Sequence, residues 1–477
     1  MSDAAYQSWG RLRQAPRKAV AVADLGPLAG RRGDGNLLAY GNGRSYGDTC
    51  HNDAGTLIDS RAAARIHCFD PVEGTLTADA GILLSEITRH VAPSGWFLPV
   101  TPGTQFVTLG GAIANDIHGK NHHRRGTFGN WVEEIELERS DRGRLTCSRQ
   151  IEPKLFAATV AGMGLTGLIR HATIRLLKVP SLSINETTTR FDRLDDYFEL
   201  AEAADLRHEY AVAWIDSLVT GAALGRGHLI TGDHAAEGDR SGLASQPLAT
   251  IPFTPPVSPL RGIGLSAFNQ AYYRRAPKGV RQRVVRFDSF FYPLDRIGHW
   301  NRLYGPRGLH QHQSVVPLAV GPEAVRALIL CAQRAGQGSF LTVLKRFGAV
   351  ASPGLMSFPR EGYTLTLDFP HRGKRTLKLL AELDAITIAA GGAVNPYKDA
   401  RMSPQTFAAG FPRWAELEAL RDPAFASDFW RRTALQLQLE HPAACCRPHV
   451  EDFNEIGSRS LPCPSIHDAE PHGHRAY

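Results

Sequence analysis

A glycine-rich loop near the N-terminus restricts the fold of this chain more than any other feature. The strand-like residues Leu37–Tyr40 lead directly into Gly41, Gly43 and Gly47. Glycine lets backbone N–H groups face outward in conformations that other residues avoid, and such groups form a concave site for phosphate oxygens. Arg44 could add positive charge there. A tight turn between two strands is the alternative interpretation.

A second glycine-rich segment follows between Pro102 and Asp116. Pro102-Gly103 predicts a turn, and Gly110-Gly111 allows a close approach of the backbone. Thr104 and Thr108 offer hydroxyl groups. Two such loops within one hundred residues suit an extended diphosphate.

A third glycine motif, Gly162–Gly167, matches the spacing G-x-G-x-x-G, and Glu186 follows at a suitable distance. A dinucleotide site of this type needs a helix to begin at the glycines. The residues Leu168–Leu176 are β-branched and strand-like instead, which disfavours a Rossmann site. Strands followed by helices, without regular alternation, predict an α+β fold.

The coarse pattern also predicts individual elements. Helical spacing of apolar residues predicts helices over Leu83–Val91 and Leu377–Ala390, the second ended by Gly391-Gly392. Three strands of a second sheet are expected at Gln311–Val316, Ser339–Phe347 and Tyr363–Phe369.

Polar side chains alternate along that second sheet. Gln311 and Gln313 share one strand face, as do Lys345 and Phe347, and Lys398 follows the glycine pair. Such side chains can line a sugar site, because hydroxyl groups need paired donors and acceptors. An exposed sheet face is the alternative.

Histidines and cysteines raise the question of a metal. His118, His122 and His123 lie close together in the sequence, but Gly119 disfavours one helix and no carboxylate completes a ligand set. The tail with Cys445, Cys446, His449 and Cys463 shows no metal-binding spacing. We therefore expect no metal.

Composition and charge indicate the cellular compartment and the kind of partner. The 477 residues include seven cysteines without a CxxC pair, which fits a reducing compartment. No signal peptide or apolar run long enough for a membrane span is seen, so a cytoplasmic protein is expected. The formal net charge of +7 suits a phosphate or an acidic membrane surface. Nucleic acid is not expected, because the basic residues do not form one element with interleaved aromatics.

Taken together, these segments resemble the vanillyl-alcohol-oxidase (PCMH-type) FAD-binding family. Within it the chain is most similar to the decaprenylphosphoryl-β-D-ribose 2′-oxidases, the flavin subunits of a ribose epimerase. The resemblance runs from about Trp9 to Leu435. It is carried by Gly41–Asp48, Pro102–Thr104, Gly110–Ala114, Ile117–His123, Gly164–Gly167, Tyr292–Asp295, Trp300–Arg302, Tyr304–Pro306 and Ser357–Pro359.

The resemblance implies a division of the chain. Residues 1–182 would form the FAD-binding domain, residues 183–390 the substrate domain, and residues 391–440 a return to the FAD-binding domain. Residues 441–477 would be a poorly ordered extension. FAD would be held non-covalently, because the first glycine loop lacks the flavin-linking histidine of covalent members.

The resemblance also implies roles for single residues. The FAD contacts would come from Gly41, Asn42, Gly43, Arg44, Ser45, Tyr46, Gly47, Pro102, Gly103, Thr104, Thr108, Gly110, Gly111, Ala112, Asn115, His118, Gly119, Asn121, His123, Gly167 and Ile169. Substrate contacts would come from Lys120, Arg302, Gln311, Gln313, Lys345, Phe347, Thr364, Thr366 and Lys398. Lys398 is the first candidate for the proton acceptor, with Tyr46 and His118 as alternatives.

The implied reaction is hydride transfer from a polyprenylphosphoryl ribofuranose to the flavin, leaving a 2′-ketosugar. A separate NAD-dependent short-chain reductase would complete the epimerisation that leads to an arabinose donor. An oxidase of free alditols or aldonolactones, and a flavin-binding carrier without catalysis, are the alternatives.

Several positions depart from the family pattern. Thr366 stands where the inhibitor-reactive cysteine is expected, Thr364 where an asparagine is, and Phe291 and Asn395 where tyrosines are. The basic, aromatic stretch Tyr272–Arg283 corresponds to a mobile loop near the pocket mouth. We expect it to meet the substrate phosphate or an anionic membrane surface, unless it is simply a solvated loop.

Overall fold

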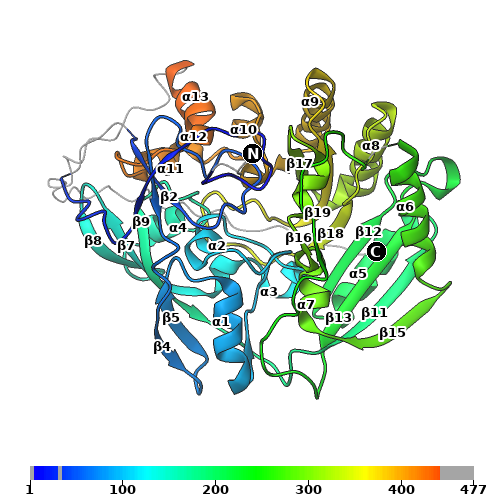
Figure 1. The fold of residues 1–477 in the computed structure, drawn as a ribbon, viewed down its shortest axis with the longest axis horizontal. Coiled ribbons are helices and arrows are strands. Elements are labelled where there is room, and N and C mark those ends of the chain that lie inside the picture. Colours follow the sequence, from blue (N-terminus) through cyan, green and yellow to red (C-terminus); the bar gives the residue numbers. More distant parts are fainter. Residues whose placement is uncertain (1–4, 31–34, 261, 441–477) are drawn as a thin grey trace, which may run out of the picture.

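The computed structural model describes residues 5–30, 35–260 and 262–440, which form two lobes side by side (Figure 1). The first lobe contains strands β1 to β10 and helices α1 to α4, and the second contains β11 to β20 and α5 to α9. The predicted extension 441–477 lies outside the described residues. No described helix is both long enough and apolar enough to cross a membrane.

Two sheets build the first lobe. A small parallel sheet has the order β1-β3-β2, and a five-stranded antiparallel sheet has the order β4-β5-β9-β7-β8. The strands are β1 (Lys18–Ala21), β2 (Leu37–Tyr40), β3 (Thr56–Asp59), β4 (Ile66–Asp70), β5 (Thr75–Asp79), β6 (Trp96–Phe97), β7 (Val132–Arg139), β8 (Gly143–Ser148), β9 (Leu168–Arg175) and β10 (Leu177–Lys178). The helices are α1 (Leu84–Val91), α2 (Leu109–Ala114), α3 (His122–Arg125) and α4 (Pro153–Thr159). The predicted helix over Leu83–Val91 is confirmed as α1.

The second lobe is an eight-stranded antiparallel sheet with the order β15-β11-β13-β12-β18-β19-β17-β20. Its strands are β11 (Ile184–Phe191), β12 (Tyr210–Ile215), β13 (Gly227–His234), β15 (Val280–Val285), β17 (Leu309–Val316), β18 (Val343–Phe347), β19 (Gly362–Pro370) and β20 (Ala393–Val394). A separate two-stranded pair joins β14 (Ala249–Thr250) to β16 (Ile297–Gly298). The helices are α5 (Leu194–Arg207), α6 (Gly262–Arg275), α7 (Phe287–Phe291), α8 (Gly321–Arg334) and α9 (Lys374–Ala389).

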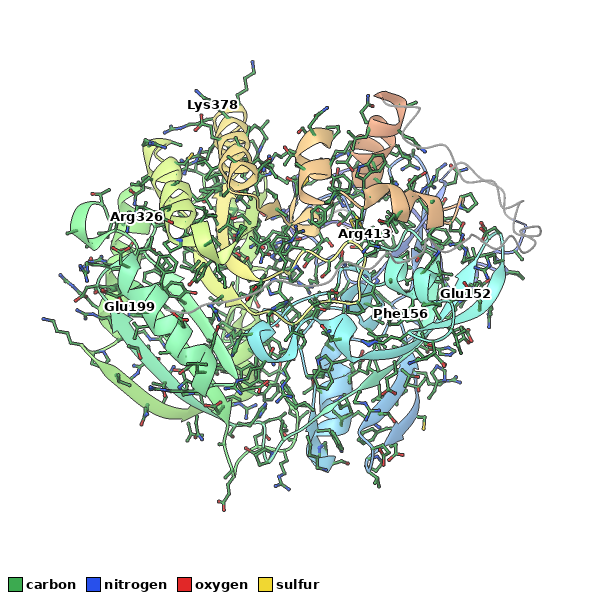
Figure 2. The ribbon with its side chains drawn as sticks, turned by 180° about the vertical axis from the view of Figure 1, so that it is seen from behind. Glu152, Phe156, Glu199, Arg326, Lys378 and Arg413 are labelled. Atoms are coloured by element: carbon green, nitrogen blue, oxygen red, sulfur yellow. The ribbon has the colours of Figure 1, made fainter. Side chains whose placement is uncertain are left out.

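Helices α5, α8 and α9 cover one face of this sheet and carry Glu199, Arg326 and Lys378 (Figure 2). On β19, Leu365 and Leu367 join the core beneath these helices, whereas Thr364 and Thr366 alternate onto the opposite face. Both sets are buried, because the first lobe covers the second face. The alternation therefore separates an apolar core from a buried polar surface.

The last described segment returns to the first lobe. Helices α10 (Pro404–Gly410), α11 (Trp414–Leu420), α12 (Asp428–Arg432) and α13 (Ala434–Glu440) lie there in Figure 1, and Phe425 forms a parallel bridge with Leu37 of β2. β20 still pairs with β17, so the second sheet continues past residue 390. The domain limits at 182, 390 and 440 stay predictions.

One expectation is wrong. The stretch Tyr272–Arg283 is not a loop, because it contains the end of α6 and most of β15. β15 is ordered by pairing with β11 over six residue pairs at the sheet edge. The expected strand after Gly162–Gly167 is confirmed as β9, and α3 begins only at His122, leaving His118 outside it.

Asp422 joins the returning segment to the first lobe. Its buried carboxylate accepts hydrogen bonds from the Ser140 N–H at 2.7 Å, the Ser140 hydroxyl at 2.5 Å and the Ala424 N–H at 2.9 Å. We predict that Asp422→Ala lowers the free energy of unfolding by about 2–4 kcal/mol, because three donors lose their acceptor. The exposed Glu416, paired with Arg413, supplies the control: Glu416→Ala should cost less than about 0.5 kcal/mol. Equal losses in urea titrations would contradict this prediction.

Candidate functional site

A cavity lies between the two lobes and is lined by both. The centres of water molecules can occupy about 400 Å³ of it. Of the predicted site residues, it is lined by Gly41, Asn42, Gly43, Arg44, Ser45, Tyr46, Pro102, Gly103, Thr104, Thr108, Gly110, Gly111, Asn115, His118, Gly119, Lys120, Gly167, Ile169, Gln311, Gln313, Lys345, Thr366 and Lys398. The two glycine segments and the polar sheet face therefore meet in one site.

Seven predicted residues do not line the cavity: Gly47, Ala112, Asn121, His123, Arg302, Phe347 and Thr364. Arg302 turns away and donates to the carbonyls of Ile251 and Pro252. Asn121 donates to the Pro99 carbonyl and Glu209, and His123 contacts the His208 carbonyl and Asp205. Each of these three side chains is held by protein partners, and direct ligand contact by them stays a prediction.

The other four predicted residues lie directly behind the residues that line the cavity. Phe347 packs its ring 4.8 Å from that of His118, and the Thr364 hydroxyl accepts a hydrogen bond from Gln313 at 3.1 Å. Ala112 is buried within α2. At Gly47 a Cβ would lie 1.5 Å from the Asp399 carbonyl oxygen, so this glycine packs backbone against backbone rather than facing the cavity.

The first glycine loop leaves a row of donors free. Among the described residues, no acceptor lies opposite the N–H groups of residues 42–45. The loop is held from outside by the Ser45 carbonyl, which accepts from Trp9, and by the Tyr46 N–H, which donates to the Tyr397 carbonyl. Arg44 lies 4.5 Å from the Trp9 ring centroid, and its buried Nε has no partner. This cradle fits a diphosphate, because buried donors require an acceptor.

The second glycine segment contributes less to an anion site than its sequence indicates. The N–H groups of Leu109, Gly110 and Gly111 already donate to the Ile82 carbonyl, the Ala80 carbonyl and the Thr108 hydroxyl. Gly110 is required for packing, because a Cβ there would lie 2.9 Å from the Ala80 Cβ. Gly103 differs: a Cβ at this position would meet nothing within 4 Å and would project into open space.

Polar side chains of the second sheet form the other end of the cavity. Gln311 donates to Asp368 at 2.6 Å, and the Tyr304 hydroxyl donates to the second Asp368 oxygen at 3.4 Å. Burial raises the pKa of Asp368 to about 7, although the Gln311 hydrogen bond and nearby Lys398 oppose that shift. The Lys398 ammonium lies 4.2 Å from the Tyr46 ring centroid.

Three partly buried lysines, Lys120, Lys345 and Lys398, line the cavity. Burial lowers the pKa of Lys120 and of Lys398 to about 8. Burial, with repulsion from the other two lysines, lowers the pKa of Lys345 to about 7. Lys120 donates to the Phe290 carbonyl. The site is therefore cationic near neutral pH and contains amines that lose their protons at accessible pH.

A directed chain of hydrogen bonds sets the protonation of His118. The Tyr397 N–H donates to Asn395 Oδ1, and Asn395 Nδ2 donates to Gln313 Oε1. Gln313 Nε2 therefore faces His118 Nε2, at 2.9 Å, as a donor. This places the proton of neutral His118 on Nδ1, 3.3 Å from the Gly119 carbonyl; Lys345 Nζ, 3.0 Å from the same nitrogen, can accept that proton's hydrogen bond only as the neutral amine. Burial and nearby Lys345 lower the His118 pKa, so the ring is neutral.

Sequence reasoning missed Asp368 and Asn395. Asp368 continues the alternation of Thr364 and Thr366 along β19, a signal that could have placed it on the cavity side. Asn395 was noted only as a departure from the family. Its contact with Gln313 depends on the position of residues after β20, which no local pattern reveals.

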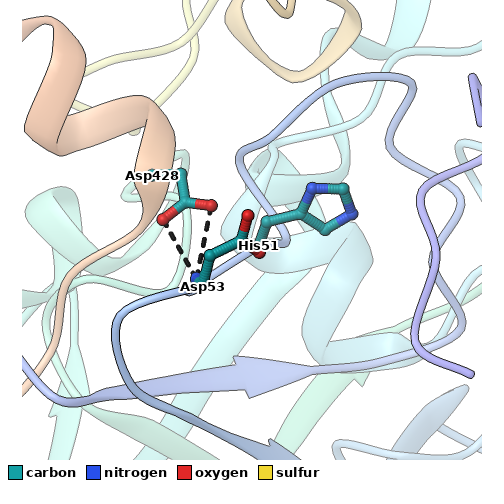
Figure 3. Close-up of side chains that lie close together, drawn as sticks. All are labelled: His51, Asp53 and Asp428. Carbon is teal, nitrogen blue, oxygen red and sulfur yellow. Dashed lines mark hydrogen bonds between the residues drawn. The ribbon is translucent and has the colours of Figure 1, made fainter. Parts of the chain in front are cut away.

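A possible metal group lies elsewhere. Within residues 5–30, 35–260 and 262–440, His51, Asp53 and Asp428 come close enough to share an ion. The Asp53 N–H donates to both Asp428 oxygens (Figure 3). Arg13 and Arg17 bind Asp53 at 2.5 and 2.8 Å, and Arg17 also contacts His51. These guanidinium groups neutralise the cluster, which fastens the N-terminal segment to α12.

Comparison with known proteins defines the class. A family model described as an FAD binding domain matches residues 15–147, the part that carries both glycine segments. With the donor-lined cradle, this places the chain among FAD-dependent oxidoreductases.

Relatives that match most of this chain define its family. Decaprenylphosphoryl-beta-D-ribose oxidase of Mycolicibacterium smegmatis is 33% identical over 90% of this chain and 96% of its own length. An uncharacterised Streptomyces coelicolor protein is 35% identical over 74% of this chain and all of its own length. D-arabinono-1,4-lactone oxidase of Eremothecium gossypii is 26% identical over 41% of this chain and 37% of its own length. The chain belongs to the decaprenylphosphoryl-ribose oxidase family.

Gly103 and Gly47 give a matched test of the cradle. Gly103→Ala should leave the unfolding temperature of the FAD-free protein unchanged, because its methyl group meets no protein atom. It should raise the FAD dissociation constant about tenfold by occupying cofactor space. Gly47→Ala should instead destabilise the FAD-free protein by about 1–3 kcal/mol, because the Asp399 backbone must move. Unchanged FAD affinity in Gly103→Ala would argue against the cradle.

The lysine pKa values predict a pH dependence. If neutral Lys398 accepts the substrate proton, kcat/KM should rise through about pH 8, because the amine is protonated below that value. Asp368 raises the Lys398 pKa, so Asp368→Asn should move the profile to lower pH while keeping an acceptor for Gln311. Lys398→Met should remove the rising limb. A profile of unchanged midpoint in Asp368→Asn would contradict the assignment.

Proposed function

We propose that this protein oxidises the 2′-hydroxyl of a polyprenylphosphoryl-β-D-ribofuranose to a ketone, with non-covalent FAD as the electron acceptor. The observation that supports it most is the joining of two sites in one cavity: a donor-lined cradle at one end, and buried lysines and glutamines at the other. The ribose oxidase of M. smegmatis, similar along almost the whole chain, supports the substrate class.

Several side chains that line the cavity suit such a substrate. Lys120, Lys345 and Lys398 supply positive charge for a phosphate and donors for sugar hydroxyls. The lining also includes the apolar or aromatic side chains of Trp214, Tyr272, Phe291, Leu294, Trp300 and Leu341. Cationic and apolar groups in one cavity match a phosphate that carries a prenyl chain.

Among the candidate proton acceptors, Lys398 fits best. Its neutral form is reached near pH 8, within the range of ordinary enzyme chemistry. Burial raises the Tyr46 pKa, so that its phenolate is disfavoured. His118 is neutral, but its Nε2 already accepts from Gln313. Tyr46 and His118 would instead orient substrate and cofactor.

FAD, when bound, supplies the two-electron acceptor for the hydride that leaves the sugar carbon. Residues 42–45 and Gly103 would hold its diphosphate, and Gly167 and Ile169 would lie at its adenosine end. His118 and Gly119 would lie along its ring. Packing of the first lobe over the polar sheet face would exclude water from the reacting atoms.

A ketosugar product defines the next step. Reduction from the opposite face would invert the carbon and give an arabinose donor. We propose a separate NAD-dependent short-chain reductase as the partner that supplies this hydride.

A second candidate function is oxidation of a free sugar lactone or alditol. The partial match to D-arabinono-1,4-lactone oxidase favours it. The match covers less than half of either chain, so we rank this function second.

Anaerobic reduction of the flavin separates these functions. Farnesylphosphoryl β-D-ribofuranose should bleach the holoenzyme, with kcat/KM about 100-fold above that for free ribose, ribitol or arabinono-1,4-lactone, because the lipid phosphate contributes remote binding energy. Lys398→Met should retain FAD but bleach slowly. Faster bleaching by the free lactone or alditol would establish the second function. Failure of all substrates would indicate a flavin-binding protein without this activity.

A further inference from the structure

One segment of the chain carries its excess of positive charge. Residues 240–287 contain seven arginines and one lysine, and no aspartate or glutamate. Because the whole chain has a formal charge of +7, the remaining residues sum to −1. The basic character is therefore local.

The same segment exposes an unusual share of apolar side chains. Seven of the fourteen large apolar side chains exposed among the described residues lie here: Leu243, Leu248, Phe253, Val257, Phe268, Val280 and Val284. Leu248 and Phe253 are 72% and 67% exposed. Arg274, Arg275 and Lys278 are also exposed, and no carboxylate of the described residues pairs with them. We call residues 240–260 and 262–287, the part of this range that the structure describes, the basic segment.

The basic segment borders the cavity at α6. Tyr272 of α6 lines the cavity, and the exposed Phe268 ring lies 4.8 Å from Phe340, next to the cavity-lining Leu341. The loop before α6 is held by Arg302 and by pairing of β14 with β16. β16 is followed closely by Trp300, which also lines the cavity.

We propose that the basic segment docks onto an anionic phospholipid bilayer, with the cavity mouth facing the lipid. Exposed arginines and lysine supply charge complementarity to acidic headgroups. Single leucine, phenylalanine and valine side chains among them can enter the interface between headgroups and acyl chains, where such a mixture is stable. This occupant fits better than a protein, because the apolar groups are spread along loops, the middle of α6 and an edge strand rather than gathered in one packed patch.

Docking on a bilayer would explain how the substrate reaches the site, and this part of the inference rests on the proposed function. A polyprenyl phosphate is anchored in a bilayer by its chain. A mouth that faces the bilayer would let the sugar phosphate reach the lysines while the chain stays in apolar surroundings. The lipid-linked substrate would not have to cross water.

Vesicle sedimentation of the FAD-loaded full-length protein tests the proposal. Binding to mixed phosphatidylcholine and phosphatidylglycerol vesicles should exceed binding to phosphatidylcholine alone and should weaken as salt is added. The triple variant Arg274→Gln, Arg275→Gln, Lys278→Gln should bind about 10- to 100-fold more weakly, since each basic residue near the surface contributes to the attraction. The variant Leu248→Ser, Phe253→Ser should also bind more weakly.

Matched controls make the outcome decisive. Arg326→Gln, Lys378→Gln, Arg413→Gln removes the same charge from α8, α9 and the start of α11 (Figure 2) and should bind like the unaltered protein. Val72→Ser, Leu206→Ser removes two even more exposed apolar groups elsewhere. Equal losses in both triple variants, or no preference for anionic vesicles, would overturn the proposal. No vesicle binding would point to a protein partner instead.

Turnover distinguishes this inference from the proposed function. Without vesicles, all variants should oxidise a water-soluble short-chain prenylphosphoryl ribose at the unaltered rate. With substrate embedded in anionic vesicles, only the basic-segment variants should be slowed. Vesicle binding without oxidation of either substrate would contradict the proposed function but would still support the docking surface.

Discussion

Burial of the second sheet on both faces is the constraint on which the site depends. Helices α5, α8 and α9 remove one face from water, and the first lobe removes the other. Polar side chains on that second face cannot be satisfied by bulk solvent, so each must find a protein or ligand partner. Gln311 finds Asp368, and Gln313 lies between His118, Thr364 and Asn395. The network is thus a consequence of closure of the two lobes.

The same burial sets the electrostatics. An isolated buried lysine favours its neutral form, and three that share a cavity favour it further. Lys345 has the lowest pKa of the three because Lys120 and Lys398 both repel its charge. Asp368 acts in the opposite direction on Lys398. An anionic ligand would raise all three lysine pKa values, so arrival of a phosphate would change the proton balance of the site.

Local features were predictable from the sequence, and long-range contacts were not. The glycine loop, helix α1, helix α9 and the strands after Gly167 follow from residues next to each other in the chain. The period-two alternation correctly placed Gln311 and Gln313 together. It could not show that Arg302 turns to backbone carbonyls, or that the N–H groups of α2 are already occupied, because both depend on segments distant in sequence. For 272–283, the resemblance implied a mobile loop, whereas pairing with β11 makes much of it an edge strand.

The cavity contains groups that complement both a flavin nucleotide and a lipid-linked sugar phosphate. Free backbone donors, neutralisable lysines and amides, and apolar side chains all line this cavity, as does Tyr272 of the basic segment. A flavin nucleotide and a lipid-linked sugar phosphate present complementary groups: a diphosphate, a ring, a sugar with its phosphate, and a prenyl chain. A free lactone would leave the charged and apolar parts of this cavity without partners. Desolvating lysines that no ligand group meets costs free energy, so the arrangement favours the larger, anionic substrate.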